Sequence, residues 1–257
     1  MITRIIYPLS FRARLSYKLD KLFKNLNPRD VSVLYGNDVK MDLLDTDFGH
    51  RRIIMNGFYE LKLSQDISKL AKKGGLLIDV GANYGYYSCI WASAKSTNKV
   101  AAFEASPVNL EPLKNNISKN NLNNQVIINE CAAGKEKGKL RFNLAREENQ
   151  SGWGGLTIDN DTESVEVDVD TLDNYAVKNS IDSIQVLKID TEGADTWVLY
   201  GAKDLLEKKK IEHIFFEYNL PRMRLLNISP DEAPKFLNDL GYTVERTSPT
   251  DYYAYPN

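Results

Sequence analysis

Apolar runs that alternate with helical segments beyond residue 75 limit the folds open to this chain more than any other feature. Each run is short, and the segment after it has apolar residues at helical spacing. This alternation is typical of a parallel sheet covered by helices on both faces, an α/β fold. Core strands are predicted at 75–80, 99–105, 125–133, 184–190 and 211–218, with helices at 84–94, 107–120 and 195–208.

Further patterns surround this core. They predict a hairpin around Gly36, a helix at 63–73, an antiparallel pair at 139–145 and 163–172, a helix from the Ser229 capping box to Gly241, and closing strands at 242–247 and 252–256. The loop between the antiparallel strands carries Trp153, a residue type on which sugar rings stack. We therefore expect an extension at 1–70 in front of one large domain at 71–257.

A basic amphipathic helix is predicted at 11–26. Its apolar positions are Phe11, Leu15, Leu19, Leu22, Phe23 and Leu26, and its basic positions are Arg12, Arg14, Lys18, Lys21 and Lys24. Such a helix can lie on a membrane surface or pack on its own domain with a solvated basic side. We expect the second arrangement, because six apolar positions are enough to dock a helix.

Composition excludes several classes of protein. The formal net charge is −2, without the basic excess of a nucleic-acid-binding domain. No apolar run approaches the roughly 18 residues of a transmembrane helix, and no signal peptide is evident, so we expect a cytoplasmic protein. Cys89 and Cys131 lie in apolar runs and are expected to be buried thiols. A homo-oligomer remains open.

A strand, a glycine-containing turn and a helix follow one another in LLIDVGANYGYYS. Such a turn is expected to place free backbone N–H groups where the polar end of a ligand approaches, and Gly81 and Gly85 lack the Cβ atoms that would block it. Dinucleotide sites use G-x-G-x-x-G, whereas here the glycines stand four apart with Asp79 ahead. This arrangement favours a ligand with an amino-acid end, and we expect Asn83 and Tyr84 to line the part of the site that holds this end.

Glu104 ends the second predicted core strand, where an acid can accept hydrogen bonds from ribose hydroxyls. After the third strand, Cys131 and Ala132 offer small side chains beside which an adenine ring could lie. An amino-acid end, a ribose and an adenine together describe S-adenosylmethionine.

Several motifs, in order, resemble those of the FkbM-type methyltransferases: NGFYE, DVGANYGYYS, FEASPVNL, KIDTEGAD followed by VLYGA, and FFEY. The resemblance spans about residues 40–245 and implies the class I, Rossmann-like fold with a seven-stranded sheet of order 3-2-1-4-5-7-6, the last strand antiparallel. It also implies that Glu60, Ala105, Ser106 and Asn109 contact the cofactor. Thr191 and Asp195 stand where the family often has Val and Glu.

Candidate catalytic residues follow from the carboxyl-end rule for open α/β sheets. Asp190 and Glu192 come directly after the fourth core strand, and Glu217 ends the fifth. Such carboxylates could orient a hydroxyl, act as a base or bind a metal, but no loop with metal-ligand spacing is evident, so no metal is assigned. His50 could reach the pocket if the 1–70 extension forms a lid.

The sequence therefore predicts an S-adenosylmethionine-dependent O-methyltransferase whose acceptor is a sugar or another small natural product, such as a polyketide or peptide. An N- or carboxyl-methyltransferase is the nearest alternative. Two other hypotheses are a cofactor-binding module without turnover and a nicotinamide-dependent oxidoreductase. The absence of the third glycine of the dinucleotide motif disfavours the oxidoreductase.

Overall fold

The central sheet has seven strands in the order β12-β13-β11-β10-β3-β4-β5. The computed structural model describes residues 2–19, 29–144, 155–156 and 164–257. The strands are β3 Leu76–Val80, β4 Lys99–Phe103, β5 Val126–Asn129, β10 Ile184–Ile189, β11 Ile211–Glu217, β12 Tyr242–Arg246 and β13 Asp251–Pro256. Only β13 in this sheet runs against its neighbours. The strand order and the antiparallel strand that the resemblance implied are confirmed.

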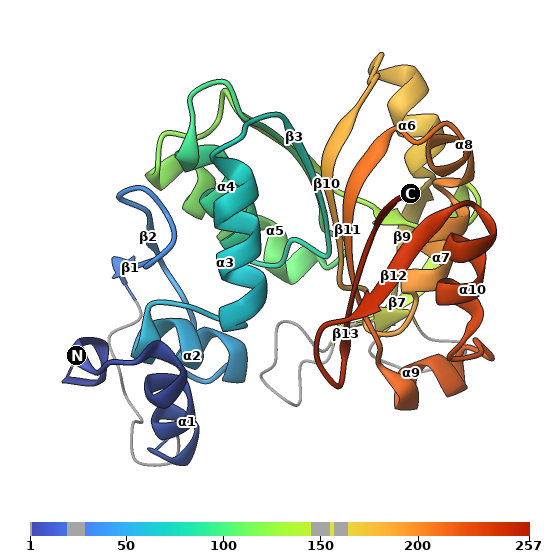
Figure 1. Cartoon of the computed structure of the whole chain (residues 1–257). Helices are drawn as coiled ribbons and strands as arrows, with labels where there is room; N and C mark the ends of the chain where they lie inside the picture. Colours follow the sequence, from blue (N-terminus) through green and yellow to red (C-terminus); the bar gives the residue numbers. More distant parts are fainter. Residues whose placement is uncertain (1, 20–28, 145–154, 157–163) are drawn as a thin grey trace.

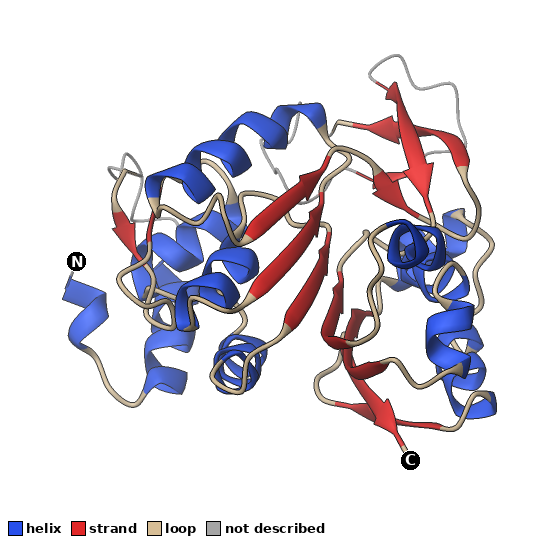
Figure 2. Cartoon of the chain, turned by 90° about the horizontal axis from the view of Figure 1, so that it is seen from above, coloured by secondary structure: helices blue, strands red, loops and turns tan. Residues whose placement is uncertain are grey.

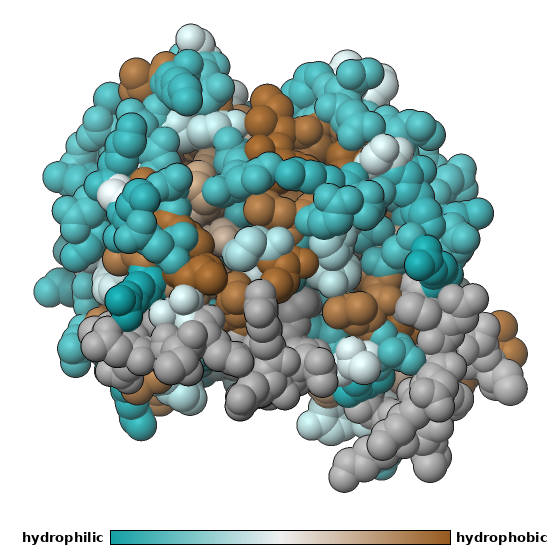
Figure 3. Space-filling view, turned by 180° about the vertical axis from the view of Figure 1, so that it is seen from behind, coloured by the Kyte–Doolittle hydropathy of each residue, from teal (hydrophilic) through white to brown (hydrophobic). Residues whose placement is uncertain are grey.

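Helices cover both faces of this sheet (Figure 1, Figure 2). One face carries α3 Leu61–Ala71, α4 Tyr86–Ala94 and α5 Pro107–Lys119, and the other carries α6 Leu172–Lys178, α7 Asp195–Tyr200, α8 Lys203–Glu207 and α10 Glu232–Asp239. Leu77 packs into the core on the first face and Ile78 into the core on the second, because successive strand side chains point in opposite directions. Apolar side chains also gather along the middle of the rear surface (Figure 3).

A second, smaller sheet lies beside the first, with the strand order β6-β9-β7-β8. Its strands are β6 Ala132–Ala133, β7 Gly138–Asn143, β8 Gly155–Leu156 and β9 Ser164–Asp170. The antiparallel pairing of β7 with β9 was predicted and is confirmed. The single strand predicted at 125–133 is wrong, because the chain leaves the central sheet after Asn129 and β6 pairs with β9 instead. Trp153 lies outside the described residues.

Helix predictions failed in two ways. The helix expected at 195–208 is divided into α7 and α8 near Gly201, where a Cβ atom would lie only 2.0 Å from the Gly134 carbonyl oxygen. Three helices were not predicted: α2 Phe48–Asn56, α6 and α9 Leu220–Leu225. Each follows a side chain that accepts a hydrogen bond from the helix's first turn, namely Asp47, Thr171 and Asn219. Those caps were the available sequence signal.

The extension expected at 1–70 packs on the main domain. It contains η1 Ile2–Ile5, α1 Leu9–Leu19, β1 Val31–Ser32, β2 Lys40–Met41, α2 and most of α3. The predicted hairpin is confirmed, because β1 pairs antiparallel with β2. Val39 and Ile67 belong to the same core cluster as Leu77 and Trp91, so the apolar core continues across residues 70 and 71.

The N-terminal helix packs on its own chain, as predicted, but not through the side chains that were expected to dock it. Among the side chains of α1 that the structure describes, Arg12 and Ser16 are buried and Leu15 is partly buried, whereas Phe11 is 54% exposed. Hydrogen bonds to backbone carbonyls, including Asn56 O at 2.9 Å, satisfy the Arg12 guanidinium. Leu22, Phe23, Leu26, Lys21 and Lys24 lie outside the described residues.

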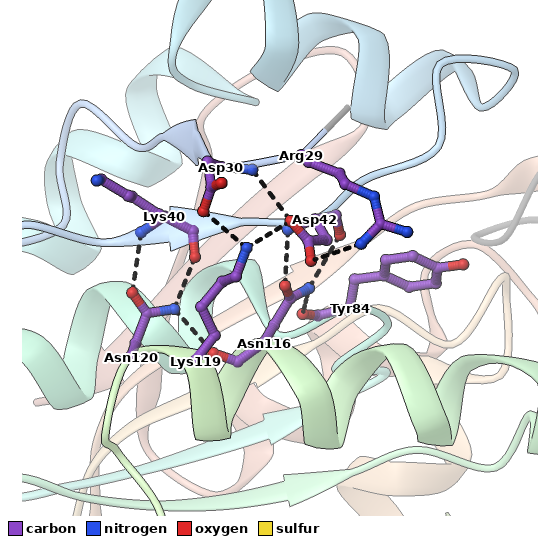
Figure 4. A network of polar contacts seen from close by, with 8 residues as sticks. All are labelled: Arg29, Asp30, Lys40, Asp42, Tyr84, Asn116, Lys119 and Asn120. Atoms are coloured by element: carbon purple, nitrogen blue, oxygen red, sulfur yellow. Dashed lines mark hydrogen bonds and ion pairs between the residues drawn. The ribbon is translucent and has the colours of Figure 1, made fainter. Parts of the chain in front are cut away.

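Side chains of α5 hold the hairpin strand β2 in place (Figure 4). The Asn116 amide accepts from Asp42 N at 2.8 Å and donates to Asp42 O at 3.2 Å and to Tyr84 O at 3.0 Å. Lys119 Nζ donates to Asp42 Oδ1 at 2.7 Å. Asn116 is therefore the link between the extension, α5 and the turn after β3.

Replacing Asn116 with Ala is expected to lower the free energy of unfolding by about 2–4 kcal/mol, because buried backbone groups lose their partners. Urea denaturation followed by circular dichroism measures this difference. Asn115→Ala is the matched control, since its exposed amide bonds only Glu111 on the same helix, and it should cost less than about 0.5 kcal/mol. Equal stabilities of the two variants would contradict the role of Asn116.

No helix among the described residues is long and apolar enough to cross a membrane. Both cysteines are free thiols. Cys89 is fully buried, as predicted, and Cys131 is partly buried.

Candidate active site

In the part of the chain that the structure describes, three cavities open at the carboxyl ends of β3, β4, β10 and β11, and one of about 250 Å³ lies beside Glu60, Asp190 and Glu217. The other two hold most of the predicted site. The smaller, about 80 Å³, is lined by seven predicted cofactor residues: Gly81, Asn83, Glu104, Ala105, Asn109, Cys131 and Ala132. The larger, about 600 Å³, is lined by all four predicted catalytic residues, His50, Asp190, Glu192 and Glu217, and by Glu60 and Tyr84. Gly81, Asn83, Asp190 and Glu192 line both cavities. The structure thus brings most of the predicted site together.

The glycine turn differs from its prediction. Every N–H group from residue 81 to residue 85 already has an acceptor within the chain, so the expected free donors are absent from this turn. A Cβ on Gly81 would lie 1.9 Å from Asp190 O, and a Cβ on Gly85 would lie 2.7 Å from Leu113 Cδ1. Both glycines also have positive φ angles, +72° and +86°. They are required for the close approach of β10 and α5, and Gly85 does not line either cavity.

Glu104 lies on the wall of the smaller cavity. Its Oε2 accepts from Asn83 N at 2.7 Å, and its Oε1 accepts from Ser106 N at 2.7 Å and weakly from the Asn109 amide at 3.5 Å. A carboxylate has about four lone-pair positions, so one on Oε2 is left for a ligand hydroxyl. Ser106 is buried and does not line either cavity. It holds the Glu104 carboxylate in place through its backbone N–H group.

The far wall of the smaller cavity comes from the second sheet. Cys131, Ala132 and Ala133 lie opposite Glu104, and Phe142 of β7 adds an aromatic side chain. Phe142 was not predicted, although the strand that carries it was. Only the pairing of β7 with β9, and of β9 with β6, brings it to the cavity.

Asp79 lies behind the glycine turn and lines neither cavity. Its carboxylate accepts from Ser88 Oγ at 2.6 Å and lies 3.4 Å from Lys188 Nζ. Lys188 Nζ also lies 3.5 Å from Asp190 Oδ2 and donates to Gly81 O at 2.9 Å. Burial alone would lower the pKa of Lys188, but the Asp190 and Asp79 carboxylates raise it above its usual value. This buried cation therefore joins Asp79, the glycine turn and Asp190.

Three carboxylates meet on the wall of the larger cavity. Oxygens of Asp190, Glu192 and Glu217 lie within 4.8 Å of one another. Burial, and then the charge of Asp190, raises the pKa of Glu192 to about 8 and that of Glu217 to about 10. Asn219 of the unpredicted loop before α9 donates to Glu192 Oε2 at 2.7 Å. Carboxylates with raised pKa values are stronger bases than ordinary ones and cluster at functional sites.

Glu60 joins this carboxylate group on the larger cavity. It precedes α3 with a φ of +40° and accepts from Tyr87 O–H at 2.7 Å. Burial, and then Asp190, raises the pKa of Glu60 to about 7. Glu60 thus lines the larger cavity with Asp190 and does not line the smaller cavity with Glu104, and its contact with the cofactor stays a prediction.

His50 begins α2 and points to the glycine turn. Its Nδ1 accepts from Leu44 N at 3.2 Å, so Nε2 carries the proton and faces Asn83 Oδ1 at 3.3 Å. Burial lowers the pKa of His50, which keeps the ring neutral. The lone pair that a base would need is engaged with the backbone, so the geometry makes His50 a positioning residue for Asn83.

Residues 79–244 match the profile described as the Methyltransferase FkbM domain. The chain belongs to the FkbM methyltransferase family. It is therefore an S-adenosylmethionine-dependent methyltransferase with a class I fold.

Solved structures similar to this FkbM methyltransferase are distant. They include a putative caffeoyl-CoA O-methyltransferase from Staphylococcus aureus, with 13% identity, a TM-score of 0.48 and coverage of 78% of this chain and 85% of that one. The SAH-bound methyltransferase PaMTH1 from Podospora anserina has 10% identity, a TM-score of 0.48 and coverage of 78% and 80%. The METTL16 methyltransferase domain has 13% identity, a TM-score of 0.49 and coverage of 85% and 73%. No curated protein matches. The family match thus carries the assignment.

The residues around the smaller cavity of this FkbM methyltransferase fit the nucleoside part of S-adenosylmethionine. Glu104 Oε2 has a lone pair for a ribose hydroxyl, and Cys131, Ala132 and Phe142 offer apolar surface for a purine ring. The shared wall of Gly81, Asn83 and Asp190 leads from there toward the larger cavity.

Glu104→Ala is expected to weaken the binding of S-adenosylhomocysteine by about 1.5–3 kcal/mol, because charge-assisted hydrogen bonds to the ribose are lost. Isothermal titration calorimetry measures this change. Glu130→Ala is the matched control, since Glu130 is exposed and pairs only with Lys114. An unchanged dissociation constant in folded Glu104→Ala would remove this residue from the ribose site.

Acid should weaken the same interaction. Burial raises the pKa of Glu104 to about 7. Protonation of this carboxylate removes the negative charge that strengthens its hydrogen bond with a ribose hydroxyl. We therefore expect affinity for S-adenosylhomocysteine to fall as the pH is lowered through about 7. Glu104→Gln should bind weakly and lose this pH dependence, whereas an unaltered pH profile in that variant would assign the titration to another group.

Proposed function

We propose that this methyltransferase methylates a hydroxyl group of a sugar or another small natural product held in the larger cavity. The observation that supports this most is the position of Asp190. It lies where the two cavities meet, so one carboxylate can face both the cofactor and the acceptor.

Asp190 would hold the acceptor hydroxyl and take its proton as the new bond forms. A neutral hydroxyl is a poor nucleophile, and a positioned carboxylate contributes about 10²–10⁴-fold in rate. Lys188, 3.5 Å away, keeps a positive charge beside Asp190. S-adenosylmethionine, when bound, supplies a methyl group on a sulfonium sulfur, which is open to in-line displacement. Most of the remaining acceleration would come from positioning.

Glu192 and Glu217 would bind other polar groups of the acceptor. Both have raised pKa values, so near neutral pH they hold protons and can donate as well as accept. A polyhydroxylated molecule offers partners for both modes. This match favours a sugar-like acceptor.

N-methylation is the alternative that the site also favours. The larger cavity is lined by the acidic residues Asp47, Glu60, Asp190, Glu192 and Glu217, with Lys188 and Arg222 as cations. Asp190 could accept a hydrogen bond from an amine as well as from a hydroxyl, so the same carboxylate would serve N-methylation. Carboxyl-methylation is the other alternative.

Transfer from S-adenosylmethionine carrying a ¹³C-labelled methyl group tests the proposal. The enzyme is incubated with paired acceptors, such as glucosamine with glucose and tyramine with tyrosol, and NMR assigns the labelled methyl to oxygen or nitrogen. We expect O-methyl products. Labelling confined to nitrogen would establish the amine alternative, and labelling of neither member of any pair would contradict small hydroxylated acceptors.

A metal requirement is not expected. Three carboxylates without a nitrogen or sulfur ligand suit Mg²⁺ or Ca²⁺, but Asp190 already faces the Lys188 ammonium group, 3.5 Å away. Turnover should therefore survive EDTA. Loss of turnover with EDTA and recovery with Mg²⁺ would instead show that the carboxylates bind a cation.

A further inference from the structure

Helix α1 buries two polar side chains and leaves aromatic side chains exposed. Arg12 is 2% exposed and Ser16 is fully buried, whereas Phe11 is 54% and Tyr17 is 67% exposed. One side of the Tyr17 ring contacts α2, where Arg52 Cζ lies 4.9 Å from the ring centre, and the rest of the ring faces solvent. A helix on the surface of a soluble protein normally buries its apolar side chains and exposes its polar ones. Buried polar side chains next to exposed large apolar ones depart from this rule and indicate a functional surface. The outer face of α1 therefore requires an explanation.

The inner face is fixed by hydrogen bonds. Arg12 donates to Ile6 O at 3.0 Å, to Asn56 O at 2.9 Å and to Arg4 O, and Asn56 Nδ2 donates to Ser16 Oγ at 2.9 Å. The two contacts with Asn56 dock α1 on the carboxyl end of α2, where a carbonyl group favours a cation, and the other two join Arg12 to the segment before α1. A rotation of α1 that buried Phe11 would break them, so its exposure is built into the fold.

The outer face combines apolar and basic side chains. Ile5 is 76% and Tyr7 is 70% exposed just before the helix. Phe11, Arg14 and Lys18 follow at spacings of three and four residues, which align them along one stripe. Residues 2–19 contain no Asp or Glu. We call the six residues Ile5, Tyr7, Phe11, Arg14, Tyr17 and Lys18 the basic-aromatic face.

We propose that the basic-aromatic face docks this methyltransferase on an anionic lipid surface. Aromatic and aliphatic side chains insert at the boundary between headgroups and acyl chains, and each Lys or Arg near the surface adds attraction to anionic lipid. An anionic lipid surface complements this face in both respects, because the exposed apolar side chains can insert while Arg14 and Lys18 pair with anionic headgroups.

Docking in this way would bring the acceptor side of the enzyme near the membrane. The helix α2 that holds α1 also lines the larger cavity through Phe48, His50 and Ile53. It spans nine residues, or roughly 13 Å. An acceptor attached to a lipid would therefore lie within reach of the cavity.

Co-sedimentation of the full chain with vesicles tests the proposal. One set contains phosphatidylcholine alone, and the other contains phosphatidylcholine with about 30 mol% phosphatidylserine. We expect at least about tenfold stronger binding to the anionic vesicles, and release as salt is raised to about 0.5 M. Equal binding to the two sets, or binding to neither at low salt, would overturn the proposal.

Variants assign binding to the basic-aromatic face. Phe11→Ser with Tyr7→Ser, and separately Arg14→Glu with Lys18→Glu, should each reduce vesicle binding by at least about tenfold. Val177→Ser with Lys178→Glu is the matched control, because it changes an 82% exposed apolar residue and its basic neighbour on α6. Calorimetry with S-adenosylhomocysteine should show wild-type affinity in all three, so that misfolding is recognised independently of lipid binding.

Two results would contradict the assignment. Wild-type vesicle binding by the α1 variants would place the lipid contact elsewhere. A dimer in sedimentation equilibrium without lipid, lost in the Phe11 and Tyr7 variant, would show that a second copy of the chain covers this face.

Discussion

Asp190→Asn should lower turnover by about 10²–10⁴-fold while changing the affinity for S-adenosylhomocysteine by only a few-fold. Asparagine keeps the shape of the side chain but cannot take a proton from the acceptor. Asp190 is also one of two carboxylates that flank Lys188, but Asp79 remains 3.4 Å from that amine and keeps it paired. The turn around Gly81 should therefore hold its geometry, and the defect should appear in the chemical step.

Single-turnover release of S-adenosylhomocysteine with a saturating acceptor measures this step, and calorimetry measures cofactor affinity. Glu192→Gln is the comparison variant, and it should raise the KM for the acceptor more than it lowers kcat, because Glu192, with a pKa of about 8, holds a proton at neutral pH and would bind the acceptor without taking its proton. Full turnover by Asp190→Asn would mean that another group takes the proton. Glu217 and Glu60, the other carboxyl groups beside Asp190 in the larger cavity, would then be tested.

Gly81→Val is expected to prevent stable folding, and loss of cofactor binding would follow from that. A Cβ at this position would lie 1.9 Å from Asp190 O, a backbone atom that cannot move without shifting the end of β10. The φ angle of +72° adds about 1–2 kcal/mol for any residue with a side chain. Together these effects should lower the free energy of unfolding by more than about 4 kcal/mol. Losses of this size are typical of disrupted cores and strained backbone.

Urea denaturation and the yield of folded protein measure this prediction. Gly138→Val is the matched control, because no atom lies within 4 Å of its added Cβ and its φ is not in the left-handed region. The control should unfold close to the wild-type midpoint. If Gly81→Val also did so and lost only cofactor affinity, the glycine would be required by the ligand and the contact with Asp190 would be tolerated.

The sequence by itself determined the architecture of the central sheet. The middle strands β3, β4 and β10 are buried on both faces, as Leu77 and Ile78 illustrate, so each of them is a nearly continuous apolar run that can be recognised without knowing its neighbours. The carboxyl ends of the parallel strands carry Glu104, Asp190 and Glu217, and in a parallel sheet these ends meet at one edge. Residues that follow strands could therefore be predicted to line a common site.

The tertiary structure alone decided how the turns and edges are used. Asp79 and Gly85 belong to the predicted motif, yet both lie behind the cavities, because burial depth depends on what packs against the turn. The proton on His50 is set by Leu44 N, a backbone group whose position no side-chain pattern encodes.

The same reason explains the N-terminal helix and the second sheet. Helical spacing identified α1, but the side that faces inward was decided by the carbonyl groups of Arg4, Ile6 and Asn56, which accept hydrogen bonds from Arg12. Phe142 reaches the cofactor cavity only because β7, β9 and β6 pair away from the central sheet. Periodicity reports which residues share a face, whereas the partner of that face is fixed by contacts between segments far apart in the chain.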